Sequence, residues 1–205
     1  MRKIGLLDYG IGNVKSIQNA LTKEGAKSIL SKERQEILNC DALILPGVGA
    51  YAKGMENLIE RSFVELIHEF VATGKPFLGI CLGMQMLFDD SEEFGYTKGL
   101  GLIQGSVKKL DVELRLPHIG WSSINPHRKE WKGGILNDIP LGEKVYFVHT
   151  YAGYPSNEND VLAYCEYDGK KVCAAVQKDN VFGTQFHPEK SGNIGLRIMN
   201  NFINI

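Results

Sequence analysis

The sequence predicts an α/β fold, with a mostly parallel central sheet, helices on both of its faces and extra short antiparallel strands in the second half. In the first half, short apolar runs alternate with segments of helical periodicity, which is the order of β-α-β units. After about residue 100, short strands are separated by Gly, Pro and Asp turns. No repeat, low-complexity segment or linker divides the sequence, so we expect a single domain over residues 1–205.

Apolar spacing and terminating residues define the individual elements. The helix expected at 13–25 carries its apolar residues on one side and ends at Gly25. The strand at 41–46 is a continuous apolar run closed by proline. A longer helical stretch, in one piece or two, stops at Gly74. In chain order, the expected elements lie at 3–8, 13–25, 28–30, 41–46, 55–73 and 77–80, followed by short strands between 103 and 186 and a helix at 193–203.

Asp168-Gly169 is a strong hairpin turn signal between the strands expected at 161–166 and 171–176. A two-residue loop would place the thiols of Cys165 and Cys173 on opposite faces of the sheet. A three-residue loop would reverse this, and the sequence leaves both loops open. The pairs of the two-residue loop are Cys165 with Val172 and Cys173 with Tyr164.

The stretch around Cys81 carries the strongest chemical signal. An apolar run at 77–80 breaks at Gly79-Ile-Cys-Leu-Gly83, after which Leu82, Met86 and Leu87 begin a helical spacing. This is a strand, a tight turn and a helix with one nucleophile at the apex, the thiol version of the G-x-S-x-G elbow. The turn exposes the sulfur, and the new helix N-terminus stabilises a thiolate. The alternative without a catalytic role is a buried cysteine at the start of a helix, with a glycine two residues away on each side.

Composition excludes several classes of function. The apolar share of 43% and the charged share of 23% are ordinary for a globular domain. A net charge of −1 without a basic stripe gives no footprint for nucleic acid, and no apolar run is long enough for a membrane helix. The N-terminal apolar stretch is too short for a secretory signal. Four cysteines in such a chain fit a reducing cytoplasm, and their spacing matches no metal site.

His187 is the best candidate base for the thiol. It follows an expected strand and stands in His187-Pro-Glu189, where proline favours extended geometry. Residues two apart in an extended segment share a face, so Glu189 can hold one ring nitrogen while the other meets the thiol. His118 and His149, at the ends of apolar strands, are the alternatives, whereas His68 and His127 suit a helix surface and a solvated loop.

Two backbone regions are candidates for an oxyanion hole. The N–H of Leu82 follows the nucleophile at the start of a helix. Pro46-Gly-Val-Gly49 follows a parallel strand and lies at the sheet edge where α/β proteins bind ligands. The alternative for this loop is a simple turn that ends the strand.

These segments together resemble the class I (triad-type) glutamine amidotransferases, and more closely the glutaminase subunits of imidazole glycerol phosphate synthases. The resemblance extends in one order from residue 4 to about residue 200, and it implies a flavodoxin-like amidotransferase fold. The motifs that carry it are Asp8-Tyr-Gly-Ile-Gly-Asn13, Leu45-Pro-Gly-Val-Gly-Ala50, Gly79-Ile-Cys-Leu-Gly-Met-Gln85, Pro117-His-Ile-Gly-Trp121, Tyr146-Phe-Val-His-Thr-Tyr151 and His187-Pro-Glu-Lys-Ser191.

The resemblance implies a role for each matching residue. Cys81 would attack the side-chain amide of glutamine, His187 would act as base and then as acid, and Glu189 would orient His187. The expected oxyanion-hole residues are Gly47, Val48 and Leu82, with a rearrangement of the loop at 46–49. The expected substrate-binding residues are Gln85, Thr150 and Tyr151. Acyl transfer from a primary amide needs no cofactor, so none is expected.

The resemblance also implies a partner. Ammonia would pass through a channel to a (β/α)₈-barrel cyclase in a heterodimer, which makes imidazole glycerol phosphate and an aminoimidazole carboxamide ribotide in histidine biosynthesis. Asn13, Trp121 and Lys190 fall in motifs that face this partner. Ser122 stands where the family commonly has Asn. The alternatives are a paralogue that feeds another synthetase, such as one that amidates surface sugars, a non-catalytic subunit, and a stand-alone thiol hydrolase.

Overall fold

The computed structural model describes residues 1–127, 130–131 and 133–205. Within these residues, nine strands form the main sheet. They are β1 (Lys3–Leu7), β2 (Lys27–Ser31), β3 (Ala42–Leu45), β4 (Phe77–Ile80), β8 (His118–Pro126), β9 (Lys144–His149), β11 (Val161–Tyr167), β12 (Lys170–Lys178) and β13 (Val181–Thr184).

The main sheet joins both halves of the chain in the order β2-β1-β3-β4-β13-β12-β11-β8-β9. Its first five strands are parallel, in the order of a flavodoxin-like sheet, with β13 as the fifth strand. From β12 onward the pairing is antiparallel. The predicted mixture of a parallel centre and later antiparallel strands is confirmed.

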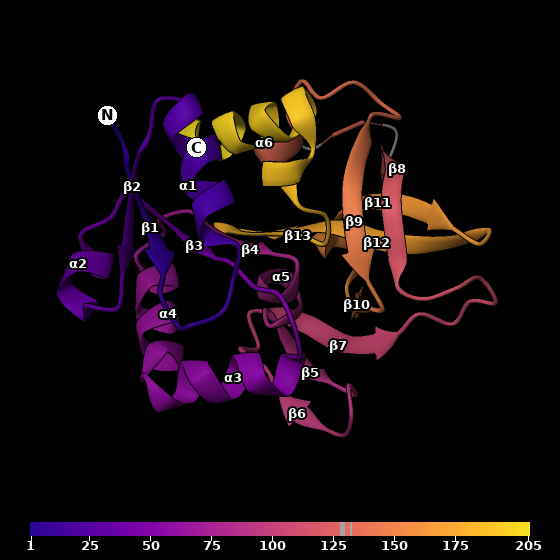
Figure 1. Ribbon diagram of the computed structural model, residues 1–205, viewed down its shortest axis with the longest axis horizontal. Helices are drawn as coiled ribbons and strands as arrows, with labels where there is room; N and C mark the ends of the chain where they lie inside the picture. Colours follow the sequence, from indigo (N-terminus) through magenta and orange to yellow (C-terminus); the bar gives the residue numbers. More distant parts are fainter. Residues whose placement is uncertain (128–129, 132) are drawn as a thin grey trace.

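Helices cover both faces of the parallel part, as predicted (Figure 1). Helices α1 (Val14–Lys23) and α6 (Gly192–Asn204) pack on one face, where Ile17 and Phe202 share a core with Ile4 of β1. Helices α2 (Arg34–Leu38), α3 (Tyr51–Glu60) and α4 (Phe63–Ala72) pack on the other face, where Phe70 shares a core with Leu7. Successive strand residues point to opposite faces, so each strand supplies both cores.

A smaller four-stranded sheet lies beside the elbow, among the described residues. Its order is β10-β7-β5-β6, and the strands are β5 (Phe88–Ser91), β6 (Thr97–Lys98), β7 (Ile103–Lys109) and β10 (Tyr151–Pro155). Three short 3₁₀ turns complete the described structure, namely η1 (Gly134–Leu136), η2 (Glu158–Asp160) and η3 (Pro188–Lys190).

The first half differs from the prediction in its helices. The polar segment after β2 contains the unpredicted helix α2. The helical stretch expected from residue 55 begins at Tyr51 and consists of two helices, broken where Ser62 adopts a left-handed φ of 55°. The other expected elements of this half lie within a residue or two of the observed bounds.

The helix after Cys81 is much shorter than its apolar spacing predicted. Helix α5 (Leu82–Gln85) is one turn long, and β5 begins at Phe88. The carbonyl of Met86 accepts from the N–H of Leu100 at 2.9 Å, and Leu87 accepts from two further backbone N–H groups. Pairing with the chain near residues 100–103 therefore replaces the second helical turn.

The hairpin has the two-residue loop. Asp168 and Gly169 have φ values of 54° and 69°, and Cys165 pairs with Val172. Cys165 belongs to one core and Cys173 to the other, so the thiols lie on opposite faces. Both are free cysteines.

In the described part of the chain, no helix combines the length and the apolarity required to cross a bilayer.

Close backbone packing at Gly83 leads to a prediction about stability. A Cβ at Gly83 would lie 1.9 Å from the Leu45 carbonyl oxygen, so Gly83→Ala must push α5 away from β3. We expect the free energy of unfolding in urea to fall by at least about 3 kcal/mol. The matched control is Gly25→Ala, where φ is +78° and a Cβ meets open space. Its loss should be only about 1 kcal/mol, and equal losses in both variants would contradict the packing argument.

Candidate active site

Three chain segments meet at the carboxyl ends of neighbouring parallel strands. The loop at 46–49 follows β3, Cys81 follows β4, and His187 comes three residues after β13. Because β3 pairs with β4 and β4 with β13, the three segments lie side by side. This is the sheet edge at which α/β folds place ligands, as the sequence predicted.

Cys81 stands at a strained elbow. Its φ of 54° and ψ of −108° are unusual for a residue with a side chain. Its N–H donates to the Thr184 carbonyl oxygen at 2.7 Å, which ties the turn to β13. A Cβ at Gly79 would lie 2.5 Å from the Gly83 carbonyl oxygen, so the two glycines permit a contact that no side chain would. The predicted nucleophile elbow is present.

His187 and Glu189 form the predicted pair. His187 Nδ1 lies 2.8 Å from Glu189 Oε1, and the two side chains are 2% and 0% exposed. The backbone reason for the pairing differs from the prediction, since His187 is extended but η3 begins at the next residue. The backbone of His187 is held by its N–H bond to the Tyr146 carbonyl oxygen at 2.9 Å.

Electrostatics support an interaction between His187 and the thiol. Burial by itself lowers the pKa of His187, but the interactions with Cys81 and Glu189 outweigh it and raise the pKa to about 9. Among the described residues, His187 Nε2 has no hydrogen-bond partner of standard geometry, so its interaction with the Cys81 sulfur is not a full hydrogen bond. Such contacts commonly tighten only when substrate binds.

A cavity of about 180 Å³ opens directly onto Cys81 and His187. Predicted residues Gln85 and Tyr151 line it, together with His149. Thr150 is not among the lining residues, and its carbonyl oxygen accepts from the Leu110 N–H at 3.0 Å. The cavity thus brings together most of the predicted substrate residues, but not the Thr150 side chain.

The predicted oxyanion segments also meet here. Val48 and Leu82 line the cavity, and a Cβ at Gly47 would lie 2.8 Å from Leu82 Cβ. Tyr9 Oη donates to the Pro46 carbonyl oxygen at 2.5 Å and anchors the start of the loop. Gly49, with φ of +98°, has no neighbour within 4 Å of a built Cβ, so the far end of the loop is loosely packed.

Two polar residues of the site escaped the sequence analysis. Glu93 lines the cavity, and one of its carboxylate oxygens accepts from the Tyr51 N–H at 2.7 Å. Gln185 is fully buried, and its Nε2 donates to Cys81 Sγ at 3.8 Å. Gln185 stands two residues before His187, in the motif that already drew attention, so its position was the available signal. Glu93 lies in an acidic turn with no such signal.

Two of the three residues expected at a partner surface, Trp121 and Lys190, lie beside Tyr146. The Trp121 ring packs edge-on against the Tyr146 ring at 6.1 Å, and Lys190 Nζ lies 6.0 Å from the centre of the same ring. Asn13 Oδ1 accepts from Ser16 Oγ, and Ser16 borders the same surface hollow as Glu189. Trp121 and Lys190 therefore lie beside the residue whose carbonyl oxygen accepts the His187 N–H, and Asn13 is bonded to a residue that shares a hollow with Glu189.

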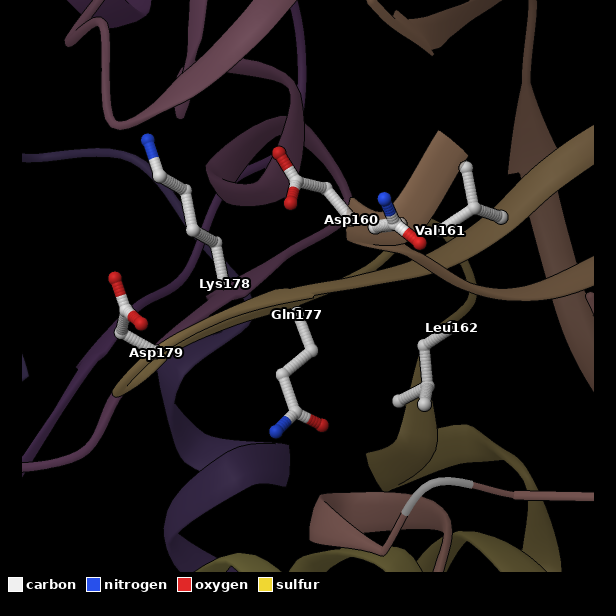
Figure 2. A pocket seen from close by; sticks show the side chains of 7 residues that line it. Asp160, Val161, Leu162, Gln177, Lys178 and Asp179 are labelled. Carbon is white, nitrogen blue, oxygen red and sulfur yellow. The ribbon is translucent and has the colours of Figure 1, made fainter. Parts of the chain in front are cut away.

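Figure 2 shows another hollow, of about 310 Å³, lined by residues that include Asp160, Gln177 and Lys178. Lys178 and Asp160 lie on one side of the strand and Gln177 on the other. Lys178 pairs with Val181 at the start of β13, so the hollow lies at the sheet edge opposite Cys81. Its described lining residues contain no nucleophile, and it plays no part in the site.

Comparison with known proteins identifies the class. The model of the family "Glutamine amidotransferase class-I" matches residues 5–205, so the chain belongs to that family. Two solved structures share the fold at low identity, a glutamine amidotransferase (TM-score 0.75, 18% identity, 98% of this chain and 99% of that one) and PurLQS from Thermotoga maritima (TM-score 0.74, 19% identity, 100% and 99%).

Relatives that align over the whole chain show to which group of amidotransferases it belongs. The chain is 44% identical over 213 residues to "Imidazole glycerol phosphate synthase subunit HisH 1" of Legionella pneumophila (strain Lens), with all of both chains covered. It is 46% identical over 199 residues to the HisH subunit of Bacillus cereus (strain G9842), covering 97% of this chain and 93% of the relative. Within the amidotransferases, the chain therefore belongs with the HisH subunits.

The thiols provide a direct test of the site. Burial raises the pKa of Cys165 to about 12 and also raises those of Cys40 and Cys173. At pH 7.5 Cys165 keeps a thiolate fraction on the order of 10⁻⁵ to 10⁻⁴. We expect iodoacetamide to label Cys81 alone in the native protein, as read by peptide mass spectrometry. Comparable labelling of Cys40 or Cys165 in the native state would contradict this picture, and denatured protein labelled at all four cysteines is the control.

Proposed function

We propose that this chain is the glutaminase subunit of an imidazole glycerol phosphate synthase, acting as one domain over residues 1–205 in the cytoplasm. It hydrolyses the side-chain amide of glutamine and passes the ammonia to a cyclase subunit. The observation that carries the proposal is the array of Cys81, His187 and Glu189, of which Cys81 and His187 line the same cavity. The HisH names of whole-chain relatives support the choice of synthase.

The chemistry runs through a thioester. His187 Nε2 takes the proton of the Cys81 thiol as Sγ bonds to the amide carbon of glutamine, and His187 gives this proton to the departing ammonia as the C–N bond breaks. Water then attacks the thioester, His187 takes one of its protons, and glutamate leaves as the sulfur is released. Glu189 holds Nδ1 of His187 throughout, so that Nε2 stays directed at the reacting atoms.

Glutamine binding is assigned to the polar groups at the far end of the cavity. Gln85 Nε2 already donates to the Tyr151 carbonyl oxygen at 2.8 Å and to Gln185 Oε1 at 3.0 Å. Both amide protons are therefore used inside the protein, and the Gln85 oxygen is left to receive the substrate ammonium. Glu93 supplies the carboxylate that a cationic amino group requires.

The oxyanion is assigned to the backbone of Leu82 and of the loop at Gly47 and Val48. Rotation of a peptide plane in this loop would complete the hole when the partner binds. The half-exposed Val48 side chain and the open surroundings of Gly49 support a loop that can move, while Gly47 is fixed against Leu82.

Replacing the nucleophile tests the function. Cys81→Ala should abolish glutamine-dependent synthesis in the complex with the cyclase, because no thioester can form. Synthesis from added ammonium salts should continue at the wild-type rate. The matched control is Cys40→Ala, which removes another buried thiol whose only polar contact among the described residues is the Glu36 carbonyl oxygen. Loss of both activities in Cys81→Ala would mean that Cys81 acts in folding or assembly instead.

The partner is proposed to be a (β/α)₈-barrel cyclase that docks on Asn13, Trp121 and Lys190 in a heterodimer. Trp121 is a large apolar side chain that is exposed on this face, which suits a docking anchor. Glutamine hydrolysis is then expected to be weak in the isolated chain and to rise with the cyclase and its nucleotide ligand.

Substitution of the anchor tests this surface. Trp121→Ala should weaken cyclase binding by at least about tenfold, measured by calorimetry. Ile59→Ala is the matched control, since Ile59 is an exposed apolar residue on α3 and should leave affinity unchanged. Co-purification of the tagged chain from its own cell checks the identity of the partner. Recovery of a different synthetase would favour the paralogue that feeds another pathway.

A further inference from the structure

Two buried histidines outside the triad face each other behind the cavity. His118 of β8 pairs with His149 of β9, and the two are 2% and 5% exposed. His118 Nδ1 lies 3.1 Å from His149 Nε2. His149 lines the cavity, and His118 is one layer further from the substrate. The mechanism above uses neither of them.

The surrounding contacts allow one arrangement of protons for a neutral pair. His149 Nδ1 lies 2.9 Å from the Tyr151 carbonyl oxygen, which can only accept, so this nitrogen carries the proton. His149 Nε2 is then bare and accepts from His118 Nδ1–H. His118 Nε2 is bare in turn, and it accepts from the Ser122 hydroxyl at 2.8 Å.

The environment keeps both rings neutral. The pKa of His149 is lowered to about 4, mainly by burial, with contributions from the neighbouring His118 and His187 and against the opposing bond to Tyr151. Burial also lowers the pKa of His118, whose ring stacks on Phe147 at 5.0 Å and on Tyr167 at 4.1 Å. A second proton on His149 Nε2 would turn two donors toward each other, and a second proton on His118 Nε2 would require the Ser122 hydroxyl to rotate and accept.

The chain of hydrogen bonds ends at the groups that hold glutamine. The Tyr151 carbonyl oxygen accepts from His149 Nδ1 and from Gln85 Nε2 at once. Gln85 Nε2 also donates to Gln185 Oε1, and Gln185 Nε2 donates to Cys81 Sγ. The orientation of the Tyr151 carbonyl therefore decides which way the Gln85 amide faces.

We infer that His118 is a positioning residue for glutamine binding: by donating to His149 Nε2, it fixes the His149 tautomer that aims the Tyr151 carbonyl at the Gln85 amide. This inference rests on the proposed glutaminase function. Ser122, whose hydroxyl completes the chain, lies on the same strand face as His118, while its neighbour Trp121 projects to the opposite, exposed face.

The tautomers are tested on the wild-type chain by ¹⁵N NMR of the imidazole nitrogens at neutral pH. Both His118 and His149 should carry the proton on Nδ1 and have a bare Nε2. An Nε2–H form of either ring would overturn the inference, whatever the behaviour of any variant.

Binding of L-glutamine provides the second test, measured by calorimetry in the Cys81→Ala background so that no turnover occurs. His118→Phe keeps an aromatic ring between Phe147 and Tyr167 but removes the donor, and it should raise the Kd about tenfold. His118→Asn keeps an N–H close to the position of Nδ1 and should stay within about twofold of the parent. Binding by His118→Phe equal to that of the parent would overturn the inference alone, as would an equal loss in both variants with unchanged melting temperatures. A Cys81→Ala parent that binds no glutamine would overturn the proposed function and the inference together.

Discussion

The left-handed backbone at Cys81 is the constraint on which the rest of the site depends. With a φ of 54° and a ψ of −108°, Cys81 lies in a sparsely populated region that costs a residue with a side chain about 1–3 kcal/mol, so the surrounding structure must enforce it. β13 holds the Cys81 N–H, and β3 approaches Gly83 so closely that a methyl group would overlap the Leu45 carbonyl oxygen. The strain is thus supported by the strands on both sides of β4. In return, the thiol projects from the sheet edge toward the cavity.

The same strand neighbour also delivers the base. Thr184 pairs with Ile80 in the parallel register of β13 on β4, so the residues that follow each strand emerge together. Gln185 and His187 consequently meet Cys81, although about 100 residues separate them in sequence. A shift of one residue in this register would turn His187 toward the opposite side of the sheet. Alignment of the triad is therefore a property of the sheet more than of the elbow.

Much of this arrangement could be predicted from local patterns. The elbow, the His187–Glu189 pair and the hairpin turn at Asp168-Gly169 are each encoded within a few residues, and the structure contains all three, although the sequence left the length of the hairpin loop open. The predicted helix after Cys81 was longer than the observed one. Met84, Met86 and Leu87 are all buried. A run of apolar residues that are all buried does not show whether the segment is a helix or a strand.

Other features depend on long-range pairing that no local pattern encodes. The contact between His118 and His149 exists only in the β8–β9 register, and Glu93 reaches the cavity because β5 joins the smaller sheet. From the sequence, both histidines were predicted to lie at strand ends as alternative bases, and no contact between them was predicted. The His187–Glu189 pair was predicted from an extended backbone, whereas in the structure a 3₁₀ turn brings the two side chains together.

Tyr146 links the proposed partner surface to the catalytic histidine. Its ring lies between Trp121 and Lys190 on the outside, while its carbonyl oxygen accepts the His187 N–H. Its own N–H donates to Ser191 Oγ, and that hydroxyl donates to the His187 carbonyl oxygen at 2.7 Å. The main chain of His187 is therefore bonded to Tyr146, whose ring contacts both Trp121 and Lys190. A partner that displaces the Tyr146 ring would also move β9, whose Tyr146 carbonyl oxygen holds the backbone of His187. Tyr146 therefore connects the proposed docking surface to the catalytic histidine.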